Sequence, residues 1–112
     1  MEKMKIYISL PISGYDLTDR MYTADRIEED LRHLFPFAEI FNPLSTYNPS
    51  EGELEWQVYM ARDLHHLYGC THIYMAKGWK ESQGCRLERA ISLEENILAL
   101  PVVLPCQGFV EL

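Results

Sequence analysis

Cysteine, glycine and proline are scarce in this sequence, and it has no long apolar run. Its 112 residues contain three cysteines and no C-x-x-C pair, which excludes a disulfide framework and a cysteine-based zinc site. Glycine and proline number six each, too few for a collagen-like or low-complexity chain. The apolar runs are too short for a signal peptide or a bilayer-spanning helix. We therefore expect a soluble protein of the reducing cytoplasm with no membrane partner.

Positive charge is also scarce. Ten Lys and Arg residues face 17 Asp and Glu residues, so the formal net charge is −7. Such a surface repels an extended phosphate backbone, which argues against duplex DNA or RNA as a partner. It does not exclude a small anionic ligand, because a local group of donors can override the overall charge. The four histidines lack metal-binding spacing, and no Walker loop or G-x-G-x-x-G motif is present, so no metal or other cofactor is predicted.

Strands and helices alternate along the chain. Hydrophobic residues make up 47% of it, enough to form the core of a single domain over residues 1–112. Apolar and β-branched runs predict strands at 5–10, 38–41, 71–76 and 97–104, the last interrupted by Pro101. Apolar periodicity predicts helices at 19–34, about 53–68 and 84–96. This order predicts an α/β fold of the Rossmann-like, flavodoxin-like type: a three-layer sandwich whose parallel sheet of about four or five strands is flanked by helices.

Ligands bind such sheets beyond the carboxyl ends of the strands, where the strand order reverses. The loops at 10–18 and 77–83 follow the first and third predicted strands, so we expect the site there. The polar stretch at 45–52 is the candidate mobile loop.

Three charged residues stand out by their positions on the predicted helices. Asp63 falls within the apolar arc of its helix, where it either caps a nearby loop or serves in catalysis or binding. Arg20 continues the apolar stripe of the first helix, and it either meets an anion near the helix start or reaches out to water. Glu88 follows Ser82, a candidate N-cap, and has no basic neighbour at helical spacing. By residue type alone, a solvated surface position is favoured for Glu88.

Motifs from most of the chain combine into a recognisable set. It consists of K-I-Y-I-S at 5–9 with P-I-S-G at 11–14, N-P at 42–43, Trp56, Y-M-A-R-D-L at 59–64, Cys70, and G-W-x-x-S-x-G-x-x-x-E at 78–88. Together these motifs resemble the nucleoside 2-deoxyribosyltransferase-like superfamily, and most closely a small bacterial and phage branch of it. The resemblance covers about residues 4–104.

The resemblance implies roles for individual residues. Glu88 matches the nucleophile that attacks the anomeric carbon of a deoxyribose, Asp63 the group that assists departure of the base, and Tyr7 the donor that hydrogen-bonds the nucleophile. Relatives that hydrolyse nucleoside 5′-monophosphates have a serine at the position of Ser82 and bind the phosphate with it. Their phosphate loop carries an arginine that P-I-S-G lacks, and Arg20 is our candidate to replace it. The substrate-binding residues expected are Ser9, Pro11, Ser13, Gly14, Arg20, Trp79, Ser82 and Gly84.

These residue types suit cleavage or transfer of an N-glycosidic bond. A carboxylate can trap the oxocarbenium-like carbon while an acid protonates the leaving base, and no metal is needed. The substrate expected is a nucleoside or nucleoside 5′-monophosphate, with hydrolase and transferase both open. The alternatives are a catalytically weak nucleotide-binding module of the same fold and a structural assembly protein.

Assembly is also predicted. We expect a homodimer, or a dimer of dimers, with the second helix at the contact and the tail at 109–112 reaching a neighbour. The alternative is that Trp56 packs on the chain's own sheet.

Overall fold

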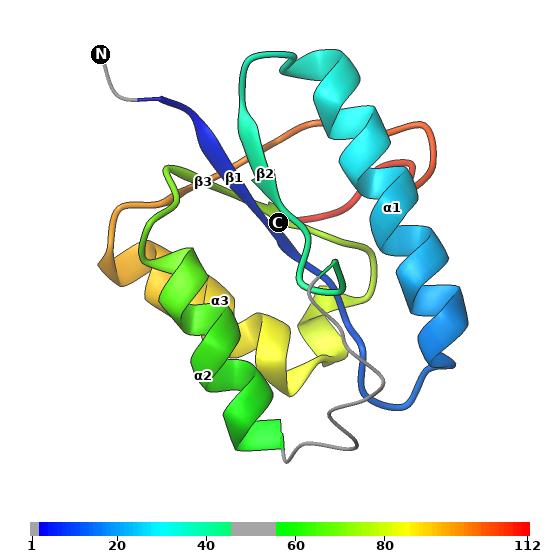
Figure 1. Ribbon diagram of the computed structural model, residues 1–112, viewed down its shortest axis with the longest axis vertical. Coiled ribbons are helices and arrows are strands. Elements are labelled where there is room, and N and C mark those ends of the chain that lie inside the picture. The colour runs from blue at the N-terminus through cyan, green and yellow to red at the C-terminus, as the bar shows by residue number, and fades with distance from the viewer. Residues whose placement is uncertain (1–2, 46–55) are drawn as a thin grey trace.

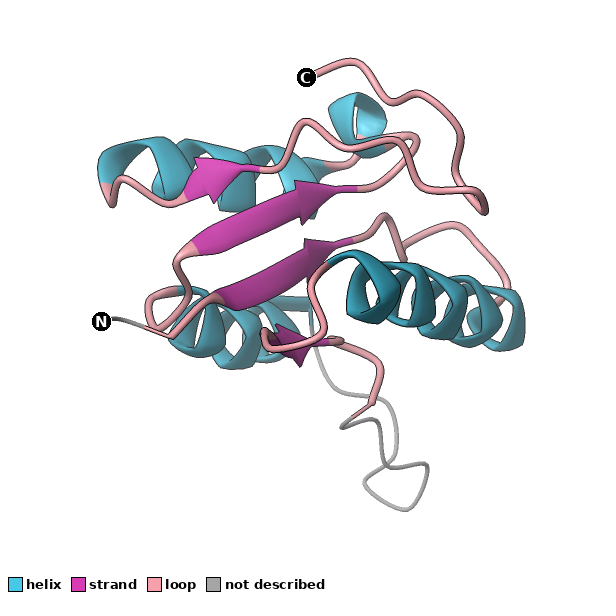
Figure 2. Cartoon of the chain, turned by 90° about the horizontal axis from the view of Figure 1, so that it is seen from above, coloured by secondary structure: helices cyan, strands magenta, loops and turns pink. Residues whose placement is uncertain are grey.

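Four parallel strands form the centre of the molecule, in the order β2-β1-β3-β4. They are β1 (Lys5–Ser9), β2 (Glu39–Phe41), β3 (His72–Met75) and β4 (Leu98–Ala99). The computed structural model describes residues 3–45 and 56–112. Figure 2 shows the four arrows pointing the same way. The predicted α/β fold with a parallel sheet is therefore confirmed.

Helices cover both faces of this sheet, which gives three layers (Figure 1). Helix α1 (Leu17–Leu34) lies on one face, and α2 (Trp56–Leu67) and α3 (Gln83–Glu94) lie on the other. A single 3₁₀ turn, η2 (Trp79–Glu81), precedes α3. Asp16 caps α1 by accepting a hydrogen bond from the Asp19 amide, so α1 begins two residues before the predicted start.

The alternation of side chains along the strands divides the core in two. Ile6 and Ile8 of β1 pack with the buried stripe of α1, whereas Tyr7 packs with the cluster of α2 and α3. These central residues are fully buried. Because β1 is buried on both faces, its continuous apolar run is typical of a central parallel strand.

The last strand is shorter than predicted. The sequence indicates a strand over 97–104, but β4 ends at Ala99. Leu100 still donates its amide to the Ile73 carbonyl, whereas Pro101 has no amide hydrogen to continue the ladder. Leu104 forms only an isolated antiparallel bridge, with Gly108. Most of the predicted loop at 45–52 and the side chain of Trp56 lie outside the described residues.

The strand order places the reversal point between β1 and β3. The chain crosses from β1 to β2 on one side and returns to β3 on the other, so the loops that follow β1 and β3 leave the same edge of the sheet. The Ala76 amide donates to the Ser9 carbonyl, which holds the two strand ends together. This is where sheets of this order bind ligands. Within the two described ranges, no helix is long and apolar enough to cross a membrane.

Candidate functional site

A buried carboxylate at the reversal point joins α3 to β1. Glu88 is 5% exposed, and its Oε1 atom accepts a hydrogen bond from the Ser9 hydroxyl at 2.7 Å. Its Oε2 atom accepts a hydrogen bond from the Tyr7 hydroxyl. Both carboxylate oxygens therefore have a fixed donor, and the surface position favoured for Glu88 by residue type is wrong.

Local structure explains how these three side chains meet. Tyr7 and Ser9 are two residues apart on β1, so both point to the face covered by α2 and α3. Glu88 belongs to the buried stripe of α3, between Cys85 and Ser92. Phe41 of the neighbouring strand β2 stacks against the Tyr7 ring, with the centroids 5.3 Å apart. The donors are therefore held by the sheet and the acceptor by the helix.

Burial changes the acidity of the group. Burial raises the pKa of Glu88 to about 7, the hydrogen bonds from Tyr7 and Ser9 act against this rise, and the Asp63 carboxylate adds to it. Burial, followed by the charges of Glu88 and Asp63, raises the pKa of Tyr7 well above its ordinary value. The phenol therefore keeps its proton and can donate it to Glu88 in a hydrogen bond.

Asp63 of α2 is the second carboxyl group of the site. It is half-buried, and burial raises its pKa to about 7, against a smaller opposing effect of Arg62. Its charge raises the pKa of both Glu88 and Tyr7, so it lies within electrostatic range of the pair. Repulsion acts on whichever carboxyl ionises second, and we assign it to Glu88, the more deeply buried group. Both carboxyl groups are therefore partly protonated near neutral pH.

The start of α3 fixes the position of Glu88. The Ser82 hydroxyl accepts a hydrogen bond from the Cys85 amide at 3.2 Å, which confirms Ser82 as the N-cap. A side chain at Gly84 would place its Cβ 3.2 Å from the Met60 sulfur, so this glycine lets α2 approach α3 closely. The structure thus gives Ser82 and Gly84 architectural roles that bring Asp63 towards Glu88.

The loop after β1 meets the loop after β3 through other predicted residues. Pro11 is buried, and its Cγ lies 3.6 Å from the place that a Cβ on Gly78 would occupy; the Tyr15 hydroxyl lies at 3.5 Å. The Arg20 guanidinium lies over the Tyr15 ring, 4.3 Å from its centroid. The Arg20 side chain is 13% exposed, and its buried Nε atom has no hydrogen-bond partner among the described residues. Arg20 therefore points inward rather than out to water.

The remaining predicted residues lie around this region. Ser13 and Gly14 are exposed in the turn closed by the Tyr15 amide and the Ile12 carbonyl, and Gly14 has a φ of 86°, which favours glycine. Trp79 packs beside the buried cluster that contains Tyr7, and its indole nitrogen donates to the Glu111 carbonyl at 3.0 Å. Within the part of the chain that the structure describes, no hydrogen bond joins Ser13, Gly14 or Arg20 to Glu88.

Sequence reasoning missed three contributors to the site. Cys85 lies one helical turn before Glu88, and hydrogen bonds from Ser82 and Ser9 oppose the burial that raises the pKa of its thiol to about 11. Its spacing of three residues from Glu88 was the available signal. The other two are Tyr15, whose ring lies under the Arg20 guanidinium, and Phe41, which stacks on Tyr7. No sequence pattern indicated either residue, because these contacts form only when the chain folds.

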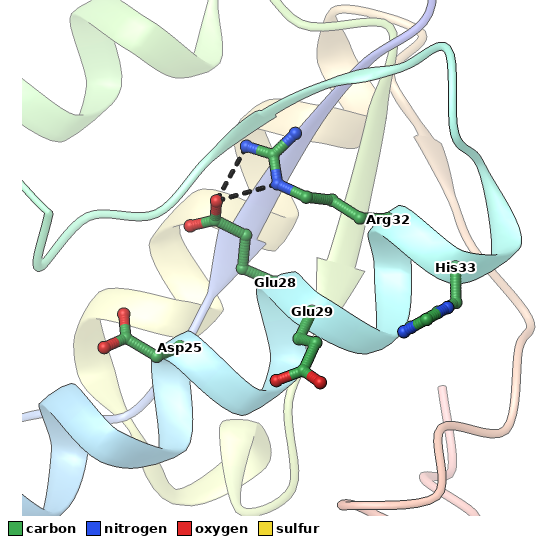
Figure 3. A pocket seen from close by; sticks show the side chains of 5 residues that line it. All are labelled: Asp25, Glu28, Glu29, Arg32 and His33. Carbon is green, nitrogen blue, oxygen red and sulfur yellow. Dashed lines mark hydrogen bonds and ion pairs between the residues drawn. The ribbon is translucent and has the colours of Figure 1, made fainter.

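Two hollows lie away from Glu88 and offer less chemistry. One, of about 420 Å³, lies along α1 and is lined by Asp25, Glu28, Glu29, Arg32 and His33; there Glu28 pairs with Arg32 at 2.7 Å (Figure 3). The other, of about 650 Å³, runs beside β2, where Lys3 and Lys5 pair with Glu39. In both, these cations already have acidic partners. Within the described ranges, no group of three His, Cys, Asp or Glu residues could hold a metal ion.

Comparison with known proteins supports the fold and assigns a family. A conserved protein from Enterococcus faecalis V583, known from its crystal structure, superposes with a TM-score of 0.68 at 17% sequence identity. The match covers 88% of this chain and 62% of that one, so the chain spans less than two thirds of its neighbour's length. No curated protein matches the sequence. The model of the family described as "Domain of unknown function (DUF4406)" matches residues 4–102, and the chain therefore belongs to that family.

Proposed function

We propose that this protein cleaves or transfers the N-glycosidic bond of a nucleoside or nucleoside 5′-monophosphate. Glu88 is the nucleophile, Asp63 the acid that protonates the leaving base, and Tyr7 the donor that orients Glu88. The observation that carries the proposal is the buried Glu88 carboxylate, held by two hydroxyls from β1, with a second carboxyl group in electrostatic range. Two carboxyl groups with separate roles are what glycosidic cleavage requires.

The first chemical step forms one bond and breaks one. An ionised Glu88 oxygen attacks the anomeric carbon, and the electron pair of the C–N bond leaves with the base. Asp63 gives its proton to the departing nitrogen, so the base leaves neutral. A covalent sugar ester on Glu88 and an ionised Asp63 remain. With both pKa values near 7, each carboxyl group is partly protonated at neutral pH, and the step proceeds from the molecules in which Glu88 is ionised and Asp63 is protonated.

The second step reverses the first with a different acceptor. Asp63 takes a proton from a water molecule or from a second base, which attacks the anomeric carbon and releases Glu88. Water gives hydrolysis, and a second base gives transfer. The same two carboxyl groups serve both outcomes, so the proposal covers both reactions.

Binding of a 5′-phosphate is supported by Arg20 and opposed by its acidic neighbour. The unpartnered Nε atom of Arg20 and the N-termini of α1 and α3 favour an anion at the loops after β1 and β3. Asp19 lies 3.6 Å from the same guanidinium and competes with a phosphate. We place Ser13, Gly14, Arg20 and Ser82 near the phosphate, with Pro11 and Trp79 at the walls of the cleft.

The decisive experiment follows release of free base from a panel of deoxynucleosides, ribonucleosides and their 5′-monophosphates. Glu88→Gln keeps the shape of the side chain but cannot form the sugar ester, so it should abolish turnover while ligand still binds. Glu94→Gln makes the same change on the exposed part of α3 and should leave the rate unaltered. Turnover that survives in Glu88→Gln would remove Glu88 from the mechanism.

The rival proposal is a nucleotide-binding module that uses the same cleft without turnover. It is favoured by the 5% exposure of Glu88 and by a pKa that leaves much of this group protonated at neutral pH. If no member of the panel releases base but a nucleotide raises the melting temperature, this second proposal replaces the first.

A further inference from the structure

Ser9, which the sequence analysis places among the expected substrate-binding residues, binds Glu88 in the structure. It is the last residue of β1 and is fully buried. Its hydroxyl donates to Oε1 of Glu88 at 2.7 Å, within the range of charge-assisted O–H···O⁻ bonds. A hydroxyl has only one proton to donate, so while it holds Glu88 it cannot also donate to a substrate.

We propose that Ser9 is a positioning residue that acts through Glu88, holding one oxygen of the buried carboxylate and stabilising its ionised form. This inference rests on the proposed function of Glu88 as the nucleophile. With Tyr7 on Oε2 and Ser9 on Oε1, the plane of the carboxylate is fixed by two donors from a single strand. One further lone pair on each oxygen is left for the reaction.

The lengths of the two donors set where the carboxylate lies. Tyr7 reaches Glu88 with a long side chain, whereas Ser9 reaches it with a hydroxyl one carbon from the backbone. The Oε1 atom must therefore lie close to the end of β1. That end is the carboxyl edge of the sheet, where the cleft of such folds lies. Ser9 thus holds the carboxylate at this edge of the sheet.

Cys85 is a further neighbour of Ser9. It lies one turn before Glu88 on the same buried stripe of α3, and Ser9 and Ser82 both act to lower the pKa of its thiol. Burial has the larger effect and raises this pKa to about 11, so at neutral pH the thiol keeps its proton and adds no negative charge beside Glu88.

The test is a titration of the Glu88 carboxyl carbon by ¹³C NMR in the full-length protein, with the signal assigned by its absence in Glu88→Gln. Ser9→Ala removes the donor with little change of volume, and Ser9→Cys keeps a weak donor. Ser92→Ala is the matched control, because Ser92 is a fully buried serine on α3 whose hydroxyl donates to the Arg89 carbonyl and not to Glu88.

Ser9→Ala should move the Glu88 titration midpoint upward by about one pH unit or more, since a charge-assisted hydrogen bond is lost. Ser9→Cys should move it less, and Ser92→Ala should not move it. In an active preparation, kcat at pH 6 should fall by about tenfold in Ser9→Ala with KM unchanged, because fewer molecules have Glu88 ionised.

Two results would overturn the inference. A rise in KM or loss of ligand affinity in Ser9→Ala, with an unchanged Glu88 midpoint, would make Ser9 a substrate contact. Equal losses of melting temperature in Ser9→Ala and Ser92→Ala, again with an unchanged midpoint, would make it structural only. The NMR titration needs no turnover. If the midpoint moves but no variant or wild-type protein releases base, the proposed function fails and the Ser9–Glu88 coupling stands.

Discussion

Arg20 differs from its cationic neighbour on α1 by its burial. Its side chain is 13% exposed and has an unpartnered Nε, whereas Arg26, which also lies over a tyrosine ring, is exposed. Arg20→Ala should weaken monophosphates by about 1.5–3 kcal/mol and unphosphorylated nucleosides far less. Arg26→Ala should affect neither. Isothermal titration with matched nucleoside and monophosphate pairs measures the difference, and equal losses for both ligand classes would make Arg20 structural.

The ionisation of Glu88 also affects stability. Its pKa is about 7 in the folded chain against 4.5 for an ordinary Glu, so the folded state holds more protons than the unfolded state between these values. The free energy of unfolding of the wild type therefore falls as pH rises through this window. Above pH 7 it is lower by about 3 kcal/mol than it would be with an ordinary Glu at position 88. Glu88→Gln has no such group. Relative to wild type, it should gain stability by about this amount from pH 4 to pH 8.

Urea unfolding at both pH values measures this gain, with Glu94→Gln as the control that should show no such trend. A constant difference between Glu88→Gln and wild type across the range would contradict the raised pKa of Glu88. Asp63 is unchanged in both proteins, so its own titration largely cancels in the comparison.

At the scale of elements, the first turn of α3 combines an observed structural role with a proposed binding role. Ser82 caps the helix, and it is also our candidate for contact with a phosphate. Ser82→Ala should cost about 1 kcal/mol of stability because the Cys85 amide loses its acceptor. Ser82→Asp should restore the cap but weaken monophosphates, since it adds a negative charge at the phosphate position. If Ser82→Asp binds monophosphates as well as wild type, Ser82 is only a cap.

The elements themselves were largely predictable from local pattern. Apolar periodicity located α1 and α3 to within two residues at each end, and the buried run of β1 was one residue too long. The predicted strand at 97–104 is longer than the observed β4. Leu100 makes the last hydrogen bond to β3, and Pro101 has no amide hydrogen to continue the ladder. The end of β4 therefore depends on its pairing with β3, which a local sequence pattern does not report.

The site was predictable only in part, because its contacts join distant residues. The position of Asp63 on the apolar arc of α2 indicated a capping or functional role for it. The family resemblance indicated Glu88 and Tyr7 as candidate site residues. The Ser9 hydrogen bond spans 79 positions and depends on how α3 packs against β1, which no local signal reports. The sequence predicts Gly84 as a substrate contact, and its close approach to Met60 becomes visible only when α2 and α3 are placed together.

At the scale of the whole molecule, the surface of α2 bears on assembly. Val58 and Ala61 are exposed one turn apart on its outer side, and Tyr68 is 57% exposed just beyond its end. Aromatic side chains such as that of Tyr68 are enriched in interface cores. The tail contacts its own chain, since Glu111 accepts from Trp79 and pairs with Lys80 at 3.5 Å. Phe109 stays 79% exposed, so it is the tail residue that a neighbour would meet.

We predict a homodimer, or a dimer of dimers, with α2 at the contact. Val58→Glu places a charge in that contact and should dissociate the assembly, because an unpaired charge in an apolar interface is costly to desolvate. Val103→Glu makes the same change at another exposed valine and should leave the assembly intact. Light scattering at micromolar concentration distinguishes the states. A single 13.1 kDa species with full activity would contradict the prediction, and the cleft would then be complete within one chain.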